Sequence, residues 1–342
     1  MKPFIIPFFI SHQGCPHRCL YCDQHRSGGR RPEPATPESV RRGLTAGLAS
    51  PRLKPGVRVE AAFYGGTFTA LPRSRQEVLL NAAAPFLKQG LVHGLRLSTR
   101  PDALDRERLA FLRSKGVVTV EIGAQSMDDR VLEAAGRGHT CEQTRQAAGL
   151  VKEAGLRLGL QLLLGLPRED DPSRDMTLQS VLDLAPDDVR LYPLLVLQGT
   201  PLAGLYRQGL YDPLSLEQAV SACARMYRRL TRNGVSVIRL GLQPTPELEM
   251  NLLAGPYHPS FGHLVAGEVF ARRFSEILAG APAGRGGPIA YVAPQDLSPA
   301  LGHGRANLKH LSAELPGLNF KPDPSLPRGW IRWQGREYHL HG

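Results

Sequence analysis

The sequence predicts an α/β fold, a partial (β/α) barrel of the TIM type with about six parallel strands and a small C-terminal α+β appendage. Apolar, strand-like runs alternate with helix-like segments about thirty residues apart, which is typical of consecutive βαβ units. The 342 residues, 42% of them hydrophobic, are enough for a large core. The alternation stops near Asn251, so we expect a core over residues 1–250 and an extension over residues 251–342.

The expected strands are apolar runs bounded by glycine, proline or polar residues. They cover Phe4–Ile10, Val57–Tyr64, Leu95–Thr99, Val117–Gly123, Leu156–Leu164, Val189–Val196 and Val235–Leu240. The expected helices follow cap signals at Thr36-Pro37, Ser74–Glu77, Asp102, Ser126–Asp129 and Thr140–Gln143, with further helices around Met176–Leu184 and over Leu216–Arg232. In the extension we expect a helix to about Leu278, a Gly280–Pro288 linker, a helix near Ala306–Leu315 and a hairpin over Trp330–Leu340.

Three cysteines lie within eight residues in Cys15-Pro-His-Arg-Cys19-Leu-Tyr-Cys22, directly after the first expected strand. This spacing lets three thiolates converge on one metal centre from a single loop. Zinc sites and iron–sulfur clusters are usually held by four ligands, but the other cysteines, Cys141 and Cys223, lie more than a hundred residues downstream. A four-iron cluster on three thiolates would leave one iron for a small molecule. The alternative is a structural zinc knuckle completed by His12, His17 or His25.

The C-x3-C-x2-C motif resembles the signature of the radical S-adenosylmethionine (SAM) superfamily. The resemblance implies a [4Fe–4S] cluster on Cys15, Cys19 and Cys22, with SAM bound at the open iron. Reductive cleavage of SAM would then release a 5′-deoxyadenosyl radical that abstracts hydrogen. Tyr21 matches the aromatic residue that shields the cluster in this family, and the electron would come from a reduced donor of the flavodoxin or ferredoxin type.

Further motifs follow the strand ends, where barrels of this kind carry their chemistry. Phe63-Tyr-Gly65-Gly66-Thr67 resembles the Gly-Gly motif that contacts SAM, and Gly123-Ala-Gln125-Ser126 resembles a motif of the coproporphyrinogen-oxidase-like and Elongator-like groups. The resemblance therefore implies a SAM site made of Gly65, Gly66, Thr67, Ser98, Gln125, Arg137, Gln161 and Tyr192. No residue is singled out as a catalytic acid or base. His139 is expected to make a local hydrogen bond, and Arg100 is either a ligand contact or a solvated loop residue.

His12-Gln13-Gly14-Cys15, Arg137-Gly-His-Thr140, Arg239–Gln243 and Gly255–His258 resemble the radical SAM half of the Elongator catalytic subunit over residues 3–265. That subunit modifies the wobble uridine of tRNA. Its acetyltransferase-type domain has no counterpart in the roughly eighty remaining residues, so we expect the radical chemistry without that domain. The alternative hypothesis for an enzyme is a small-molecule oxidoreductase of the coproporphyrinogen oxidase-like type. The alternative hypothesis of another functional class is a non-catalytic zinc-binding RNA-interaction module.

The net charge of +11 favours a polyanionic partner such as tRNA. Residues 1–60 carry ten Lys and Arg against four Asp and Glu, and Arg26, Arg30 and Arg31 follow the cysteine motif. A second basic segment, Gly302–His310, either binds phosphate or is an exposed helix cap. The first apolar run contains Pro7 and lacks a cleavage site, no run is long enough to cross a membrane, and clustered cysteines suit a reducing compartment. We therefore expect a cytoplasmic protein.

Overall fold

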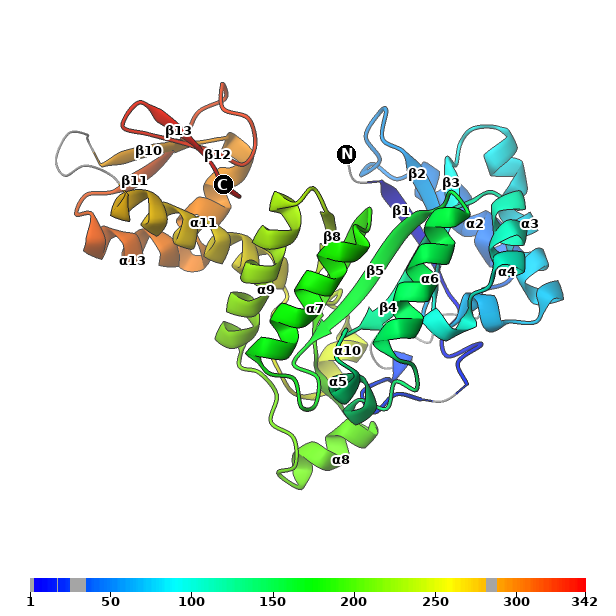
Figure 1. Ribbon diagram of the computed structural model, residues 1–342. Coiled ribbons are helices and arrows are strands. Elements are labelled where there is room, and N and C mark those ends of the chain that lie inside the picture. Colours follow the sequence, from blue (N-terminus) through cyan, green and yellow to red (C-terminus); the bar gives the residue numbers. More distant parts are fainter. Residues whose placement is uncertain (1–2, 17, 25–34, 281–287) are drawn as a thin grey trace.

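The computed structural model describes residues 3–16, 18–24, 35–280 and 288–342. Its centre is a sheet in which every neighbouring pair of strands is parallel, in the order β1-β2-β3-β4-β5-β6-β8. The strands are β1 (Phe4–Phe9), β2 (Val59–Tyr64), β3 (Gly94–Thr99), β4 (Val117–Gln125), β5 (Arg157–Leu164), β6 (Asp188–Pro193) and β8 (Ser236–Leu240). Within the described chain β1 and β8 are the two edges, so the barrel is open (Figure 1). The predicted partial barrel is confirmed, with seven strands where about six were expected.

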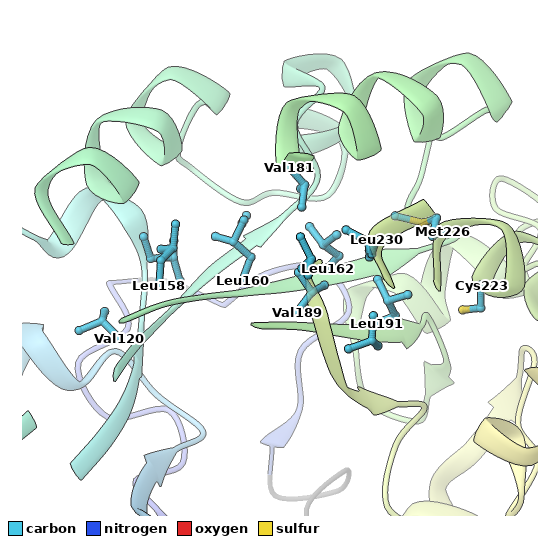
Figure 2. Packing of buried hydrophobic residues seen from close by; sticks show 14 of the residues in the cluster. Val120, Leu158, Leu160, Leu162, Val181, Val189, Leu191, Cys223, Met226 and Leu230 are labelled. Atoms are coloured by element: carbon cyan, nitrogen blue, oxygen red, sulfur yellow. The ribbon is translucent and has the colours of Figure 1, made fainter. Parts of the chain in front are cut away.

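Helices cover the outer face of this sheet (Figure 1). They are α2 (Pro37–Leu48), α3 (Arg73–Lys88), α4 (Arg106–Ser114), α6 (Cys141–Glu153), α7 (Asp171–Leu184) and α9 (Leu216–Arg232). Between helices and sheet lies the main apolar core. Figure 2 shows Leu160 and Leu191 of the sheet in the same layer as Met226 and Leu230 of α9, all of them buried. Cys223 is fully buried in this layer, as expected for an ordinary apolar residue.

Two predicted helix starts are wrong in their detail. The Ser74–Glu77 segment was expected to be a capping box, but α3 begins at Arg73 with Pro72 as its N-cap, so Ser74 lies inside the first turn. At α5 (Asp129–Ala134) the cap is Asp128, which accepts a hydrogen bond from the amide of Arg130. Ser126 is instead within 3.2 Å of Thr177 on α7, so a tertiary contact uses its hydroxyl group.

The predicted helix from Asp102 begins later, because Pro101–Ala103 forms a 3-10 turn and Asp105 caps α4. The predicted strand Val189–Val196 divides into β6 and the short β7 (Val196–Leu197), which pairs with β9 (Leu252–Ala254). Two further helices, α8 (Pro201–Arg207) and α10 (Pro246–Asn251), were not predicted. With α5 they lie at the carboxyl ends of the strands (Figure 1).

The C-terminal part forms a second sheet of order β11-β10-β12-β13, and the predicted hairpin is its β12–β13 pair. Its elements are β10 (Ile289–Val292), α12 (Leu297–Leu301), α13 (Ala306–Glu314), β11 (Asn319–Pro322), β12 (Trp330–Trp333) and β13 (Arg336–His339). Helix α11 (Phe261–Ala279) packs on α9 and reaches this sheet, where Phe274 contacts Phe320 and Trp333. The division of the chain near residue 250 stays a prediction. None of the described helices has the length and apolarity needed to cross a membrane.

Candidate functional site

The cysteine loop is held against the glycine turn that follows β2. The amide of Thr67 donates a hydrogen bond to the carbonyl of Gln13 (2.9 Å), and the sulfur of Cys15 lies 3.4 Å from the Thr67 hydroxyl oxygen. A Cβ on Gly66 would lie 2.4 Å from the Gln13 carbonyl oxygen, and one on Gly14 would lie 2.2 Å from that of Thr67. Glycine at both positions therefore permits two backbone segments to touch. The contact places Cys15 at the carboxyl edge of the sheet.

Arg137 links the same loop to the end of β4. Its guanidinium donates to the sulfur of Cys19 (3.0 Å) and to the carbonyl of Gly123 (2.7 Å). Burial by itself disfavours the charge, but the neighbouring Tyr21 and Cys19 raise the pKa of Arg137 above its ordinary value. A permanent positive charge thus faces the thiols. Such a charge stabilises thiolates, which are the form of cysteine that binds metals.

Arg100 holds Arg137 in place. Its guanidinium donates to the backbone carbonyls of Arg137 (2.7 Å) and Gly138 (3.1 Å) and forms two 2.8 Å bonds with the carboxylate of Asp102. The side chain is only 5% exposed, which excludes the interpretation of a solvated loop residue. The sequence pointed to Arg100 as a charge at a strand end but not to this bracing role.

The three thiols are close enough to influence one another. Burial raises the pKa of Cys22 to about 12, and the charges of Cys19 and Cys15 add to the effect, while Arg137 opposes it. Tyr21 packs against the apolar cluster under α8, and burial raises the pKa of its phenol above the ordinary value. It therefore stays neutral beside the thiols. This is consistent with its predicted shielding role.

His12, a ligand in the zinc alternative, braces the loop by another route. Its ring Nε2 accepts a hydrogen bond from the amide of Gln24 (3.0 Å), and the Gln24 side chain accepts one from the His12 amide. His17 and His25, the other candidate ligands, lie outside the described residues, as do Arg26, Arg30 and Arg31. Across the described ranges, no three His, Cys, Asp or Glu side chains already stand as a formed set of metal ligands, so the three thiols would have to draw together around a cluster.

The remaining predicted SAM contacts follow the strand ends from β2 to β6. Gln125 ends β4 in the left-handed region (φ 66°), a backbone conformation that is costly for a side chain other than glycine and is found at functional sites. Its side-chain nitrogen lies beside Gly123, where a Cβ added to that glycine would be 3.0 Å from this nitrogen and 3.4 Å from the guanidinium of Arg137. Ser98 is buried and points to the carbonyl of Phe63 on the neighbouring β2. The structure therefore brings Gln125 and Arg137 together with Cys19, and Thr67 together with Cys15.

Gln161 lies within β5, and Tyr192 lies near the carboxyl end of β6. The Gln161 amide donates to the carboxylate of Glu121 (2.8 Å), so a protein group supplies the partner that this polar side chain needs. Tyr192 lies near Arg190, and burial raises the pKa of its phenol. The contact of both residues with SAM stays a prediction.

Glu121 is the centre of a buried charge network that the sequence did not reveal. Its two oxygens accept hydrogen bonds from Arg96 (2.7 Å), Arg190 (2.8 Å), Tyr64 (2.7 Å) and Gln161. Although burial alone would raise the pKa of Glu121, Arg190 and Arg96 lower it to about 2. The available signal was a charged residue inside each of several strands that otherwise look like apolar core.

Arg96 extends the network across the barrel. Its guanidinium also binds Glu60 (2.8 Å) and Asp188 (2.9 Å), and the side chains of all three residues are at most 1% exposed. Strands β2, β3 and β4 each contribute one charged residue and β6 contributes two, Asp188 and Arg190, so the network links four strands of the sheet.

His139 lies between the two arginines and stays uncharged. Burial lowers its pKa to about 3, and the charges of Arg137 and Arg100 add to the effect. Its Nε2 lies 3.3 Å from the carbonyl oxygen of Ala124. The partner lies fifteen residues earlier in the chain, in β4, so the bond is a tertiary contact and not the local hydrogen bond that was predicted.

The sequence matches the model of the radical SAM superfamily over residues 9–181 and that of the radical SAM C-terminal domain over residues 186–270. The first match covers half of the chain, so this protein belongs to the radical SAM superfamily. It is therefore an enzyme of the class that uses a [4Fe–4S] cluster and SAM. The zinc-binding module without catalysis is not supported.

Two curated relatives and one solved structure make the resemblance more specific. The tRNA uridine(34) acetyltransferase of Methanocaldococcus jannaschii is 27% identical in an alignment of 254 positions that covers 63% of this chain and 47% of the relative. Elongator complex protein 3 of Homo sapiens is 28% identical over 189 residues, 49% of this chain and 35% of the relative. This chain thus spans half or less of the length of these relatives.

Elp3 from Methanocaldococcus infernus, solved with its N-terminal residues 1–46 deleted, has a similar fold. Its TM-score is 0.59 at 20% identity, over 80% of this chain and 68% of that chain. This likeness confirms the partial-barrel fold. The two curated relatives confirm the predicted resemblance to the Elongator-like group.

Proposed function

We propose that Cys15, Cys19 and Cys22 hold the [4Fe–4S] cluster, and that the enzyme cleaves SAM to modify a nucleotide of tRNA. The observation that carries the proposal is that the glycine turn after β2 holds Cys15 at the carboxyl edge of the sheet, while Arg137 faces Cys19 with a positive charge. Three soft thiolate donors in one loop fit an iron–sulfur cluster with one open iron. When bound, the cluster supplies the electron that cleaves SAM into methionine and a 5′-deoxyadenosyl radical.

The side chains of this protein would bind the cluster and SAM and orient them. Arg137 keeps its charge at the cluster ligands, and Arg100 with Asp102 fixes the loop that carries it. The residues proposed to contact SAM are Gly65, Gly66, Thr67, Ser98, Gln125, Arg137, Gln161 and Tyr192. Gly66 faces the cysteine loop on the side where a Cβ would point, so its contact with SAM would use backbone atoms.

A tRNA substrate is supported by the names of the curated relatives and by the net charge of +11. The proposal concerns the radical step alone, because this chain covers only 47% of the length of the acetyltransferase relative. A reduced protein of the flavodoxin or ferredoxin type would supply the electron. With these two proposed partners, we expect the reaction to take place in the cytoplasm.

The test is anaerobic reconstitution with iron and sulfide, followed by incubation with SAM and dithionite and an assay for 5′-deoxyadenosine. The wild-type enzyme should form the product, and Cys19→Ala should lose both the cluster absorbance and the product. Cys141→Ala is the matched control, since Cys141 lies outside the loop and contacts Asp129 and Arg145 instead. Addition of tRNA should then increase product formation. A colourless wild-type protein with stoichiometric zinc and no product would overturn the proposal.

A further inference from the structure

A basic groove lies between α9, α11 and α13, apart from the cysteine site. Its volume is about 980 Å³, and five arginines line it against two carboxylates, Glu268 and Glu276. Four of the arginines, at positions 225, 228, 229 and 232, follow one face of α9 at i, i+3, i+4 and i+7. They span about 10 Å along the helix axis. The fifth, Arg272, lies opposite on α11.

Not all of this charge is neutralised within the protein. Arg228 is paired with Glu276, Arg272 with Glu268, and Arg225 with Asp171. Arg229 donates only to the neutral amide of Gln179. Arg232 is exposed and makes no side-chain hydrogen bond or ion pair with the described residues. The C-terminal half of α9 therefore presents at least two positive charges to an outside partner.

The groove has the chemistry of a phosphate-backbone site. Guanidinium groups bind phosphate oxygens in a bidentate manner. The groove is lined by five arginines and by no Phe, Tyr or Trp, and His310 is its single aromatic ring among the described residues. The other wall is formed by the start of α13, inside the basic segment that the sequence singled out. Its Asn307 is turned inward and donates to the carbonyls of Gly267 and Pro299, so it fixes α13 to α11 and α12. The choice between phosphate binding and an exposed cap in this segment stays open, and the groove gives a reason to prefer phosphate binding.

The position of the groove limits the kind of partner. In a βα unit the helix runs antiparallel to the strands, so the end of α9 lies towards their amino ends, opposite to the cysteine site. A strand of six to eight residues is roughly 20–26 Å long. A small substrate held at the mouth does not reach the groove, whereas a folded nucleic acid does.

We propose that this groove is an anchor for the phosphodiester backbone of the RNA substrate, remote from the nucleotide that reacts. The inference rests on the proposed function, because it supposes that RNA is the substrate. It predicts binding that depends strongly on salt and only weakly on sequence, since backbone contacts carry no base information.

The test measures binding of fluorescently labelled tRNA to the reconstituted enzyme at several potassium chloride concentrations. The double variant Arg229→Glu/Arg232→Glu should bind at least about ten-fold more weakly at 0.1 M salt, and the slope of log K against log salt should fall by about two. Neither arginine has a carboxylate partner among the described residues, so the charge reversal leaves no carboxylate of the protein without its ion pair. The control Arg52→Glu/Lys54→Glu changes the charge equally at two exposed residues of the loop between α2 and β2.

The outcomes separate this inference from the proposed function. Weaker tRNA binding by the groove variant alone, with RNA-free SAM cleavage unchanged, supports the anchor. Equal losses in groove and control variants would indicate unspecific attraction and overturn it. So would wild-type affinity in the groove variant, or binding of acidic proteins or anionic vesicles in preference to tRNA. Active SAM cleavage by a wild-type enzyme that binds no tRNA would overturn the RNA substrate itself.

Discussion

Replacement of Arg96 by methionine tests the charge network inside the barrel. The substitution keeps the length and apolar volume of the side chain but removes the partner that three carboxylates share. Glu121 retains Arg190, Tyr64 and Gln161. Asp188 retains only Arg157, at 3.7 Å, and Glu60 retains the partly exposed Arg58 and Arg157 at 3.4 and 3.9 Å. The loss therefore falls on Asp188 and Glu60, which are both fully buried.

Removal of one partner from a buried ion pair costs about 3–5 kcal/mol, because it leaves an uncompensated charge. We expect Arg96→Met to lose about 4 kcal/mol of the free energy of unfolding. With a urea m-value of about 3 kcal/mol/M, the midpoint should fall by more than about 1 M. The matched control is Arg58→Met, which removes a half-exposed partner of the same Glu60 and should cost less than about 1 kcal/mol.

The loss should also depend on pH. Burial already raises the pKa of Asp188 in the wild type and Arg96 opposes that rise, so the pKa of this carboxyl group should rise further in the variant. Its penalty is absent below the unfolded pKa near 4 and grows as the pH rises through the folded pKa. The difference from wild type should be larger at pH 8 than at pH 5. A loss equal to that of Arg58→Met, or one independent of pH, would refute the reasoning. Urea unfolding of the apoprotein, followed by circular dichroism, measures both.

Two other predictions concern the turn after β2 and the turn after β5. Gly66→Ala places a methyl group 2.4 Å from the Gln13 carbonyl oxygen, so the cysteine loop must shift and the iron bound per chain after reconstitution should fall at least several-fold. The control Gly149→Ala adds its methyl group to open space on α6 and should bind iron like the wild type. Equal iron content in the two variants would contradict the role of Gly66 in positioning the cysteine loop. Burial raises the pKa of Glu169 to about 7, above its unfolded value near 4.3, so its contribution to stability is complete below pH 4 and is lost as the pH rises through 7. Between pH 5 and pH 8 the free energy of unfolding, measured by urea titration, should therefore fall by about 2 kcal/mol less in Glu169→Gln than in the wild type. Parallel pH profiles of the two proteins would show that Glu169 does not titrate in this range.

The sequence was sufficient for features that depend on local pattern. The helix over Leu216–Arg232 and the capping box at Thr140 are confirmed because each is decided by periodicity and by a hydrogen bond three residues away. Ser126 was misassigned because its hydroxyl is taken up by Thr177, fifty-one residues later in the chain. Capping rules consider only residues a few positions apart, so they do not predict a contact of this kind.

The same distinction holds at the site. The cysteine spacing identified the loop, and a resemblance identified the residues expected around it. The partners of those residues come from distant strands. Gln161 reaches Glu121 across forty residues, and Arg137 reaches Cys19 across 118 residues. The sheet register brings them together, so they could not be paired before the fold was known.

The two residues that most resemble an acid–base pair have consequences for how this interior handles protons. Glu121, with a pKa of about 2, and His139, with a pKa of about 3, each keep one protonation state throughout the physiological range. One is a fixed negative charge and the other a neutral ring, so neither takes up or releases a proton when the substrate arrives. The charge that these two residues contribute to the interior is therefore constant over that range, which suits the proposed chemistry, in which hydrogen would move as an atom and not as a proton.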